Sequence, residues 1–367
     1  MTSKVYFTDF RAPTYHENPT QKLQRLLKTA GIGDIDFNGK YTAIKIHFGE
    51  PGNLAYLRPN WAKAVADVIR ELGGRPFLTD CNTLYIGRRA NALDHLEAAY
   101  ENGYNPFTTG CHTIIADGLK GGDEVLVPVN GDFVKEAKIG KAIMEADVFI
   151  TLSHFKGHEA TGFGGTIKNI GMGCGSRAGK MEQHSDSKPK VSKSRCVGCG
   201  ICEKWCAHDA IQVNAEKKAV LNQDKCVGCG RCLTHCPTHA VFAAEDATAH
   251  SLNCKMAEYT KAVVDGRPCF HISLVVDVSP LCDCYGTNDV PIVPDVGMFA
   301  SFDPVALDQA CADAVNALCP NPNSQLEPHT CDHDHFHHLH PDTDWQDCLD
   351  HCQKIGIGSR AYELVTI

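Results

Sequence analysis

The sequence lacks any long apolar run. No stretch of its 367 residues approaches the ~20 consecutive apolar residues that a membrane-spanning helix needs. Its first residues, MTSKVYFTDF, contain no apolar core of the kind that a secretory signal carries. These absences predict a protein with no membrane partner that resides in the cytoplasm.

An excess of positive charge is also missing. Asp and Glu number 44 and Lys and Arg number 35, which gives a formal net charge of −9. Proteins that bind nucleic acids normally present a basic surface to the phosphates. We therefore expect no nucleic-acid partner, and instead a redox partner protein or a small-molecule substrate. The sequence does not indicate an oligomeric state.

Cysteine, in contrast, is abundant, with 20 residues. Such a content is typical either of small secreted scaffolds held by disulfides or of proteins in a reducing compartment whose thiolates bind metal. A chain of this length can bury a sizeable core and does not need disulfides to fold. We therefore expect thiols that are reduced or bound to iron.

Strand-like and helix-like patterns alternate along most of the chain. The strand-like runs are residues 4–7, 43–47, 77–79, 124–129, 147–152 and 270–279. The helical patterns are residues 21–31, 60–74, 90–103, 135–146, 304–318 and 345–354. This alternation predicts an α/β host domain with a mainly parallel sheet.

The alternation breaks in the middle of the chain. Residues 154–180 are rich in glycine, and a polar linker follows at 185–194. The cysteine-rich stretch then begins, and the α/β pattern resumes after it. The sequence therefore predicts a host domain in two parts, residues 1–189 and 246–367, interrupted by a small α+β insertion at 190–245.

Within the insertion, the spacing C-x2-C-x2-C-x3-C occurs twice, at Cys196–Cys206 and at Cys226–Cys236. Three thiolates at this spacing wrap around one [4Fe-4S] cluster, and the fourth ligates the cluster of the other motif. The predicted ligands are Cys196, Cys199, Cys202 and Cys236 for one cluster, and Cys226, Cys229, Cys232 and Cys206 for the other.

This stretch resembles the bacterial dicluster ferredoxin domain. One departure is that Cys206 is followed by Ala207, whereas Cys236 is followed by Pro237 as in that family. Zinc is the alternative metal, but zinc sites usually use two separated C-x2-C pairs. The duplicated pattern favours iron.

The host part resembles an uncharacterised iron–sulfur family, domain of unknown function 362. Three phrases carry the resemblance: SHFKGHEATGFGGTIKNIGMGCGSRAGK (153–180), CDCYGTNDVPIVPDVGMFASFDPVALDQA (282–310) and HPDTDWQDCLDHCQKIGIGSRAYEL (340–364). The resemblance implies an iron–sulfur protein, and an inserted ferredoxin domain at this position also resembles that family.

The glycine-rich segment is the first candidate ligand site because it follows a strand, and ligands of open α/β sheets bind at the carboxyl ends of strands. Its predicted groups are Gly162, Gly164 and Gly165, whose N–H groups can hold an anion, the cations Lys156 and Lys168, and His158, which can move a proton. The predicted ligand is a phosphate, a carboxylate or a flavin. A glycine-rich turn with surface lysines is the alternative.

Two further observations qualify this site. The G-x-G-x-x-G fingerprint of dinucleotide sites does not follow the first strand. The short run GFGGTIK is similar to the glycine-rich lysine loop of the lactate racemase family, which keeps a small acid substrate among the candidates.

Several other residues are candidates with open alternatives. Asp303 either caps the helix after it or, like Asp308, faces the crevice as a base or metal ligand. For Cys174, Cys282 and Cys284 the alternatives are a third metal site, a redox-active thiol and ordinary buried thiols. His47 follows a strand and is a further candidate for the crevice. The tail is either a metal-binding tract or an acidic loop; its histidines are His333, His335, His337, His338 and His340.

Together these patterns favour an oxidoreductase that passes electrons through two [4Fe-4S] clusters to a ligand or cofactor in the crevice of the host domain. Three alternatives stay open. The clusters are structural or sensing while the host domain performs acid–base chemistry on a small carboxylate. The protein helps to assemble another metal centre. Or it is an electron carrier without chemistry of its own.

Overall fold

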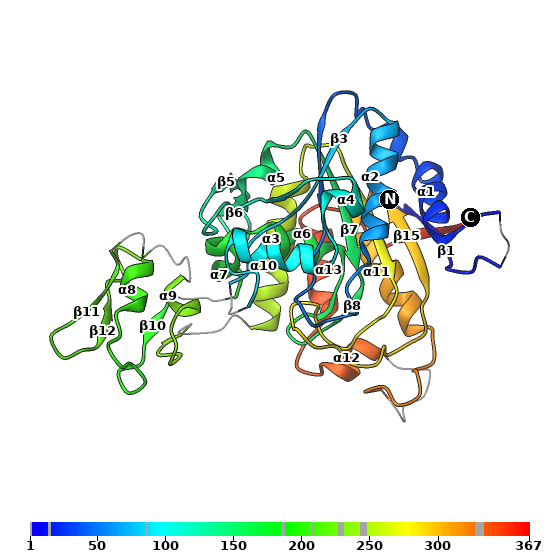
Figure 1. The fold of residues 1–367 in the computed structure, drawn as a ribbon. Helices are drawn as coiled ribbons and strands as arrows, with labels where there is room; N and C mark the ends of the chain where they lie inside the picture. The colour runs from blue at the N-terminus through cyan, green and yellow to red at the C-terminus, as the bar shows by residue number, and fades with distance from the viewer. Residues whose placement is uncertain are drawn as a thin grey trace.

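An eight-stranded sheet forms the centre of the host part in the computed structural model (Figure 1). The structure describes residues 2–13, 16–84, 87–184, 188–206, 209–226, 231–242, 248–326 and 334–367. Its strand order is β16-β1-β15-β14-β7-β2-β3-β4. The strands are β1 (Ser3–Thr8), β2 (Tyr41–Lys45), β3 (Arg75–Asp80), β4 (Thr113–Ile115), β7 (Val148–His154), β14 (Cys269–Val275), β15 (Gly297–Ser301) and β16 (Tyr362–Thr366).

Five of the seven strand pairings in this sheet are parallel, and only β15 runs antiparallel to both of its neighbours. The prediction of an α/β fold with a mainly parallel sheet is therefore confirmed. Every residue of β7 is buried, as expected for a central strand covered by helices on both faces.

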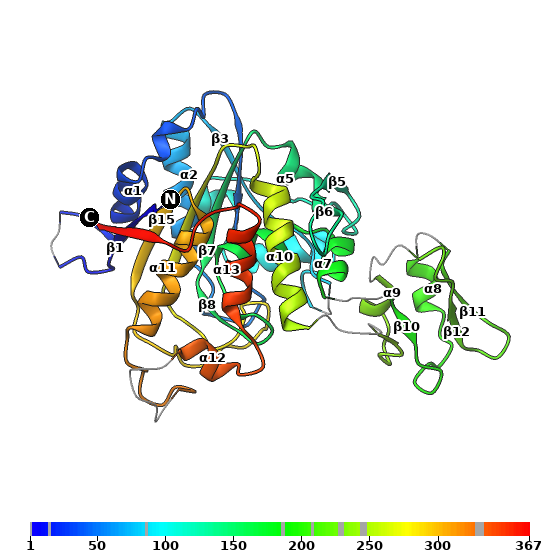
Figure 2. The ribbon, with the colours of Figure 1, turned by 180° about the vertical axis from the view of Figure 1, so that it is seen from behind.

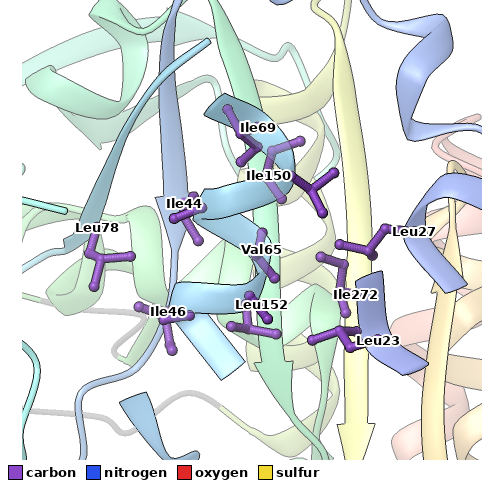
Figure 3. Close-up of a cluster of buried hydrophobic side chains, with 14 of the residues drawn as sticks. Leu23, Leu27, Ile44, Ile46, Val65, Ile69, Leu78, Ile150, Leu152 and Ile272 are labelled. Atoms are coloured by element: carbon purple, nitrogen blue, oxygen red, sulfur yellow. The ribbon is translucent and has the colours of Figure 1, made fainter. Parts of the chain in front are cut away.

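Helices cover both faces of the sheet. On one face, α1 (Pro19–Thr29) and α2 (Pro59–Glu71) pack on Ile44, Ile150 and Ile272 (Figure 3). The other face is covered by α6 (Thr166–Cys174), α10 (Ala249–Val264), α11 (Pro304–Asn316) and α13 (Trp345–Lys354), of which α10 and α13 are in front in Figure 2. Each described helix is too short or too polar to cross a membrane.

The remaining helices of the host part are shorter connections. They are the 3-10 helix η1 (Ile32–Asp34), α3 (Ala92–Glu101), α4 (Pro106–Thr109), α5 (Lys141–Glu145), α7 (Arg177–His184) and α12 (His335–Leu339). The closing helix α13 has the predicted bounds, and Gly356 follows it with a φ of 80°, a left-handed conformation that suits glycine after a helix.

The predicted helix over residues 135–146 is wrong. This segment is a strand, β6 (Glu136–Gly140), followed by a short helix, α5 (Lys141–Glu145), and β6 pairs with β5 (Glu124–Pro128) outside the main sheet. Ala137 and Ile139 are fully buried and alternate with more exposed neighbours, which is the period of a strand.

The glycine-rich segment is also more ordered than a loop. It contains β8 (Lys156–His158), β9 (Gly162–Gly164), α6 and the start of α7. A Cβ atom on Gly171 would lie 2.2 Å from the backbone oxygen of Met256, so this glycine allows α6 and α10 to pack closely.

The cysteine-rich stretch is set apart from the main sheet in Figures 1 and 2. Its elements are β10 (Lys190–Val191), α8 (Ile201–Trp205), β11 (Ile211–Val213), β12 (Ala219–Leu221), α9 (Arg231–Thr234) and β13 (Val241–Phe242). It has a small core of its own around Ile211 and Val241. One contact with the host part is Lys120, whose Nζ lies 5.7 Å from the ring centroid of Trp205.

Candidate functional site

A cavity of about 440 Å³ opens at the carboxyl ends of β2, β3 and β7, beside the loop that follows β14. Ligands of open α/β sheets bind at this edge because the polar loops and the strand ends meet there. Its charged lining comprises Lys45, Arg89, Lys156, Lys168, Lys180, Glu50, Asp80 and Glu159. Five cations therefore face three carboxylates across the cavity.

Two ion pairs form the wall on the side of β2 and β3. Lys45 Nζ lies 2.9 Å from Asp80 Oδ1, and both side chains are buried at the ends of adjacent strands. Burial raises the pKa of Asp80, but the charges of Lys45, His95 and other neighbours together lower it by more, so the carboxylate stays ionised. Arg89 Nε lies 2.7 Å from Glu50 Oε2, and Arg89 Nη1 lies 2.7 Å from His47 Nε2.

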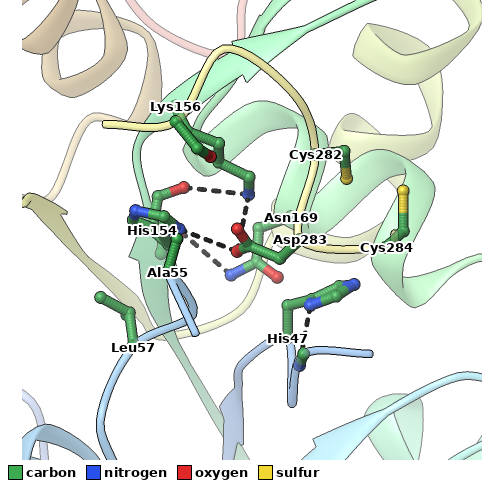
Figure 4. Close-up of polar contacts among 12 residues, drawn as sticks. His47, Ala55, Leu57, His154, Lys156, Asn169, Cys282, Asp283 and Cys284 are labelled. Carbon is green, nitrogen blue, oxygen red and sulfur yellow. Dashed lines mark hydrogen bonds and ion pairs between the residues drawn. The ribbon is translucent and has the colours of Figure 1, made fainter. Parts of the chain in front are cut away.

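A second network lies at the end of β7 (Figure 4). Asp283 Oδ2 is 2.8 Å from His154 Nδ1 and 3.5 Å from Lys156 Nζ, and Lys156 also donates to the backbone oxygen of His154 at 3.2 Å. Burial raises the pKa of Asp283, but the neighbouring His154 and Lys156 lower it by more. The carboxylate therefore stays charged and ties the loop after β14 to the strand β7.

Two thiols face the cavity from that loop. Lys168 Nζ lies 3.8 Å from Cys282 Sγ, and Cys284 lies two residues further along. A hydrogen bond from the Cys284 thiol and the charge of Lys168 hold the pKa of Cys282 well below its usual range, although burial opposes them. Burial also lowers the pKa of His158, so its imidazole is neutral and can accept a proton.

Most of the residues predicted for the crevice reach it. Lys156, His158, Lys168 and Gly165 line the cavity, and so does His47. Gly164 lies against the Lys168 side chain. Gly162 has a φ of +80° and faces Trp345, so it shapes the turn away from the cavity.

Asp303 lies elsewhere and caps α11. Its Oδ1 accepts hydrogen bonds from the N–H groups of Val305 at 2.8 Å and Ala306 at 3.0 Å, and its Oδ2 accepts from Ser3 and Ser359. Both oxygens are therefore occupied, and the residue is absent from the cavity wall. Capping, the alternative given for this residue, is what the structure shows.

The N–H groups that open α6, directly after the predicted glycines, are occupied by a protein carboxylate. Asp308 accepts hydrogen bonds from the N–H groups of Thr166 at 2.7 Å and Ile167 at 2.8 Å, the first residues of α6. A Cβ atom on Gly165 would lie 2.5 Å from Asp308 Oδ1, which explains the glycine. An anion in the cavity would therefore meet lysine side chains rather than these N–H groups.

The sequence reasoning missed Lys45, Asp80, Arg89, Lys180 and His154. Asp80 and His154 end strands of the main sheet, and Lys45 ends a buried strand, where a charged residue is rare. That position is a signal that points to a site. Arg89 and Lys180 come from segments whose sequence carries no such signal.

Four predicted cluster ligands surround one hollow in the cysteine-rich stretch. Cys196, Cys199, Cys202 and Cys236 line it together, although Cys236 comes from the second motif. The N–H of Ala219 donates to Cys196 Sγ at 3.3 Å, and the N–H of Ala240 donates to Cys236 Sγ at 3.2 Å. Soft sulfur donors with N–H groups directed at them fit an iron–sulfur cluster.

Of the second predicted ligand set, Cys206, Cys226 and Cys232 are described, and Cys229 lies outside the described residues. The N–H of Ala210 donates to Cys206 Sγ at 3.2 Å, as Ala240 does to Cys236 in the first set. The two motifs therefore share a local arrangement of sulfur and backbone.

The tail histidines have separate backbone partners. His335 Nε2 lies 2.8 Å from Leu318 O, His340 Nε2 lies 2.9 Å from Pro280 O, and His333 lies outside the described residues. Within the described part of the chain, three ligand atoms of His, Cys or acidic residues lie within 4.8 Å of one another only at Asp132, Glu258 and His351. Glu258 there accepts three backbone hydrogen bonds, from residues 132–134, so it already anchors a loop.

Comparison with known proteins gives one family and a few distant relatives. Residues 42–313 match the model of the family described as Domain of unknown function (DUF362). The thylakoid-associated protein sll1697 of Synechocystis sp. is 29% identical over 147 residues, which is 39% of this chain and 42% of that protein. The match thus spans less than half of that relative.

Two solved structures are similar at low identity. The lactate racemase apoprotein of Thermoanaerobacterium thermosaccharolyticum has a TM-score of 0.33 and 12% identity, over 76% of this chain and 51% of that one. A structural-genomics protein of Thermotoga maritima has a TM-score of 0.42 and 11% identity, over 84% of this chain and 60% of that one. At these scores neither neighbour bears on the chemistry of this chain.

Proposed function

The chain belongs to the family described as domain of unknown function 362, and from this membership and its two sites we propose that it is an iron–sulfur redox protein. In this proposal the insertion is a dicluster ferredoxin-like domain with two [4Fe-4S] clusters, and the crevice of the host part binds an anionic ligand or cofactor. When bound, clusters of this type transfer single electrons. The proposal includes a cytoplasmic location, where thiols remain reduced.

The observation that carries the proposal is the hollow lined by Cys196, Cys199, Cys202 and Cys236. A zinc site would need only four thiolates, and the four of one motif would suffice. The meeting of three thiols from one motif with one from the other is the arrangement of a dicluster domain. The N–H groups of Ala219 and Ala240 donate to two of these sulfurs and so stabilise negative charge there.

The anionic ligand is inferred from the charge of the crevice. Among the described residues, Lys168 and Lys180 have no carboxylate within ion-pair distance, while the other cations of the wall do. Lys180 instead donates to the backbone oxygen of Gly175 at 2.6 Å. The Cys282 thiolate offsets the charge of Lys168 in part, and a phosphate or carboxylate group in the cavity would supply a counter-charge for Lys180.

Potentiometric titration followed by EPR tests this function on protein purified without oxygen. We expect two reversible one-electron reductions per chain. Mass spectrometry of the purified protein identifies the bound ligand. Addition of this ligand should change the midpoint potential or the rate of cluster reduction. Clusters that cannot be reduced reversibly would contradict the proposal.

Acid–base chemistry on a small carboxylate is the second candidate, because neutral His158 and charged Lys168 both face the cavity. The same titration separates the two functions. Turnover of a carboxylate substrate by protein whose clusters stay redox-silent would favour the second candidate over the first.

A further inference from the structure

Cys282 and Cys284 lie on a tight turn at the wall of the crevice. The N–H of Tyr285 donates to the backbone oxygen of Cys282 at 3.2 Å, which closes a four-residue turn. Two residues of an extended chain span at most about 7 Å, and a turn shortens this distance. The Cα atoms of the two cysteines therefore fall in the range of about 4.4 to 6.8 Å that a disulfide bridges. In Figure 4 the two sulfur atoms lie beside each other.

The turn is fixed to the rest of the crevice by its middle residue and its backbone. The Asp283 carboxylate is held by His154 and Lys156, and its backbone oxygen accepts a hydrogen bond from the N–H of Glu50 at 3.0 Å. Asn53 donates to the backbone oxygen of Tyr285 at 3.1 Å. Because these contacts use Asp283 and the backbone, both thiols remain directed at the cavity.

The two thiols are chemically unequal. Cys282 is 2% exposed and lies 3.8 Å from the ammonium group of Lys168, and its pKa is lowered. Cys284 is less buried, and the hydrogen bond to Cys282 and burial raise its pKa well above the usual value. A thiolate beside a protonated thiol is the arrangement of an attacking and a resolving cysteine.

We propose that Cys282 and Cys284 are a redox-active dithiol–disulfide pair and that the crevice accepts a disulfide-containing substrate. The Cys282 thiolate attacks one sulfur of the substrate disulfide, a mixed disulfide forms, and one substrate thiolate leaves and takes the proton of Cys284. Cys284 then attacks Cys282 Sγ, the internal S–S bond forms and the second substrate thiolate leaves. Per turnover the substrate gains two electrons and the pair loses them.

Renewal of the Cys282 thiolate and the Cys284 thiol takes two electrons and one proton. Here the inference rests on the proposed function, because two one-electron clusters would supply one electron each. A metal site at the two thiols is the competing assignment. It is not supported, since within the described part of the chain no third His, Cys or acidic ligand atom lies within 4.8 Å of both sulfurs.

The test is thiol mapping on the oxygen-free holoprotein, equilibrated with mixtures of reduced and oxidised glutathione, quenched in acid and alkylated. Chymotrypsin cuts after Leu281 and Tyr285 and so isolates both cysteines in one short peptide. As the glutathione becomes oxidised, we expect this peptide to change from the doubly alkylated form to an unalkylated form that is two hydrogens lighter than the free dithiol. Two alkyl groups at every ratio would overturn the proposal.

Variants identify the roles of the two thiols. Cys284→Ser should trap a glutathione adduct on Cys282, whereas Cys282→Ser should leave Cys284 without adduct. Cys269→Ser, on the opposite end of β14, is the matched control and should keep the internal disulfide. An adduct on Cys284 in place of Cys282 would contradict the assignment.

Iron content and EPR are measured on the same samples. If the clusters are absent or cannot be reduced, the disulfide in the peptide should still form with oxidised glutathione. If the disulfide does not form, the clusters should still be reduced as before. The two proposals therefore fail separately.

Discussion

Replacing Lys168 by methionine should raise the pKa of the Cys282 thiol. The substitution keeps most of the aliphatic stem and removes the charge that lies 3.8 Å from Cys282 Sγ. Coulomb's law at this distance gives about 1 kcal/mol in water and about 4 kcal/mol at an effective dielectric constant of about 20. Since 1.36 kcal/mol corresponds to one pH unit, we expect the apparent pKa to rise by about 1 to 3 units.

The assay is the rate of alkylation of Cys282 between pH 4 and pH 10, read on the chymotryptic peptide of residues 282–285. Only the thiolate reacts, so the midpoint of the rate profile reports the pKa. Below the midpoint of the parent profile we expect the rate in Lys168→Met to fall by about tenfold or more, because the thiolate fraction falls tenfold for each unit by which the pKa rises. Lys156→Met is the matched control, because Lys156 pairs with Asp283 and not with the thiol.

An apparent pKa that moves by less than about half a unit in Lys168→Met would refute this reasoning. The His158→Gln variant gives an independent measurement, because His158 donates a hydrogen bond that also lowers the pKa of Cys282. We expect a rise in the same direction there. No change in either variant would mean that the thiol is not activated by its surroundings.

Three further predictions concern stability, measured by chemical denaturation. Asp308→Ala removes the acceptor of two buried N–H groups of α6 and should lower the free energy of unfolding by about 2 to 5 kcal/mol. The control is Asp303→Ala, which removes a cap away from the crevice and should lower it by about 1 to 2 kcal/mol. Equal losses in the two variants would contradict the larger role of Asp308. Asp80→Ala leaves the Lys45 ammonium buried without its partner and should cost about 3 to 5 kcal/mol; an unchanged midpoint would contradict the ion pair. Gly171→Ala should cost about 1 to 3 kcal/mol, because α6 and α10 must separate, and a gain in stability would contradict the close contact.

The sequence was sufficient for the features that are set by local pattern. The buried run of β7 and the helix α13 were predictable, because hydrophobic period and a terminal glycine determine them. Lys156, His158 and Lys168 were predictable as candidate site residues, because they lie in the glycine-rich segment that follows a strand whose end is at the ligand-binding edge of the sheet.

Other features depend on contacts between distant segments. Asp308 caps α6 from 142 residues away, so the sequence could not reveal that the first N–H groups of this helix are already occupied. Arg89 and Glu50 meet in the same way. The segment 135–146 was mistaken for a helix because its alternation of Ala137 and Ile139 with charged residues spans only five residues before a true helical turn begins.

The central claim is that two iron–sulfur clusters share ligands between the two cysteine motifs. Iron and acid-labile sulfide counted on oxygen-free protein test it most directly, with Cys236→Ser measured beside the parent chain. We expect about eight iron atoms per chain for the parent and about four for the variant, with the EPR signal of one cluster lost. Stoichiometric zinc, or an unchanged iron content in the variant, would contradict the account.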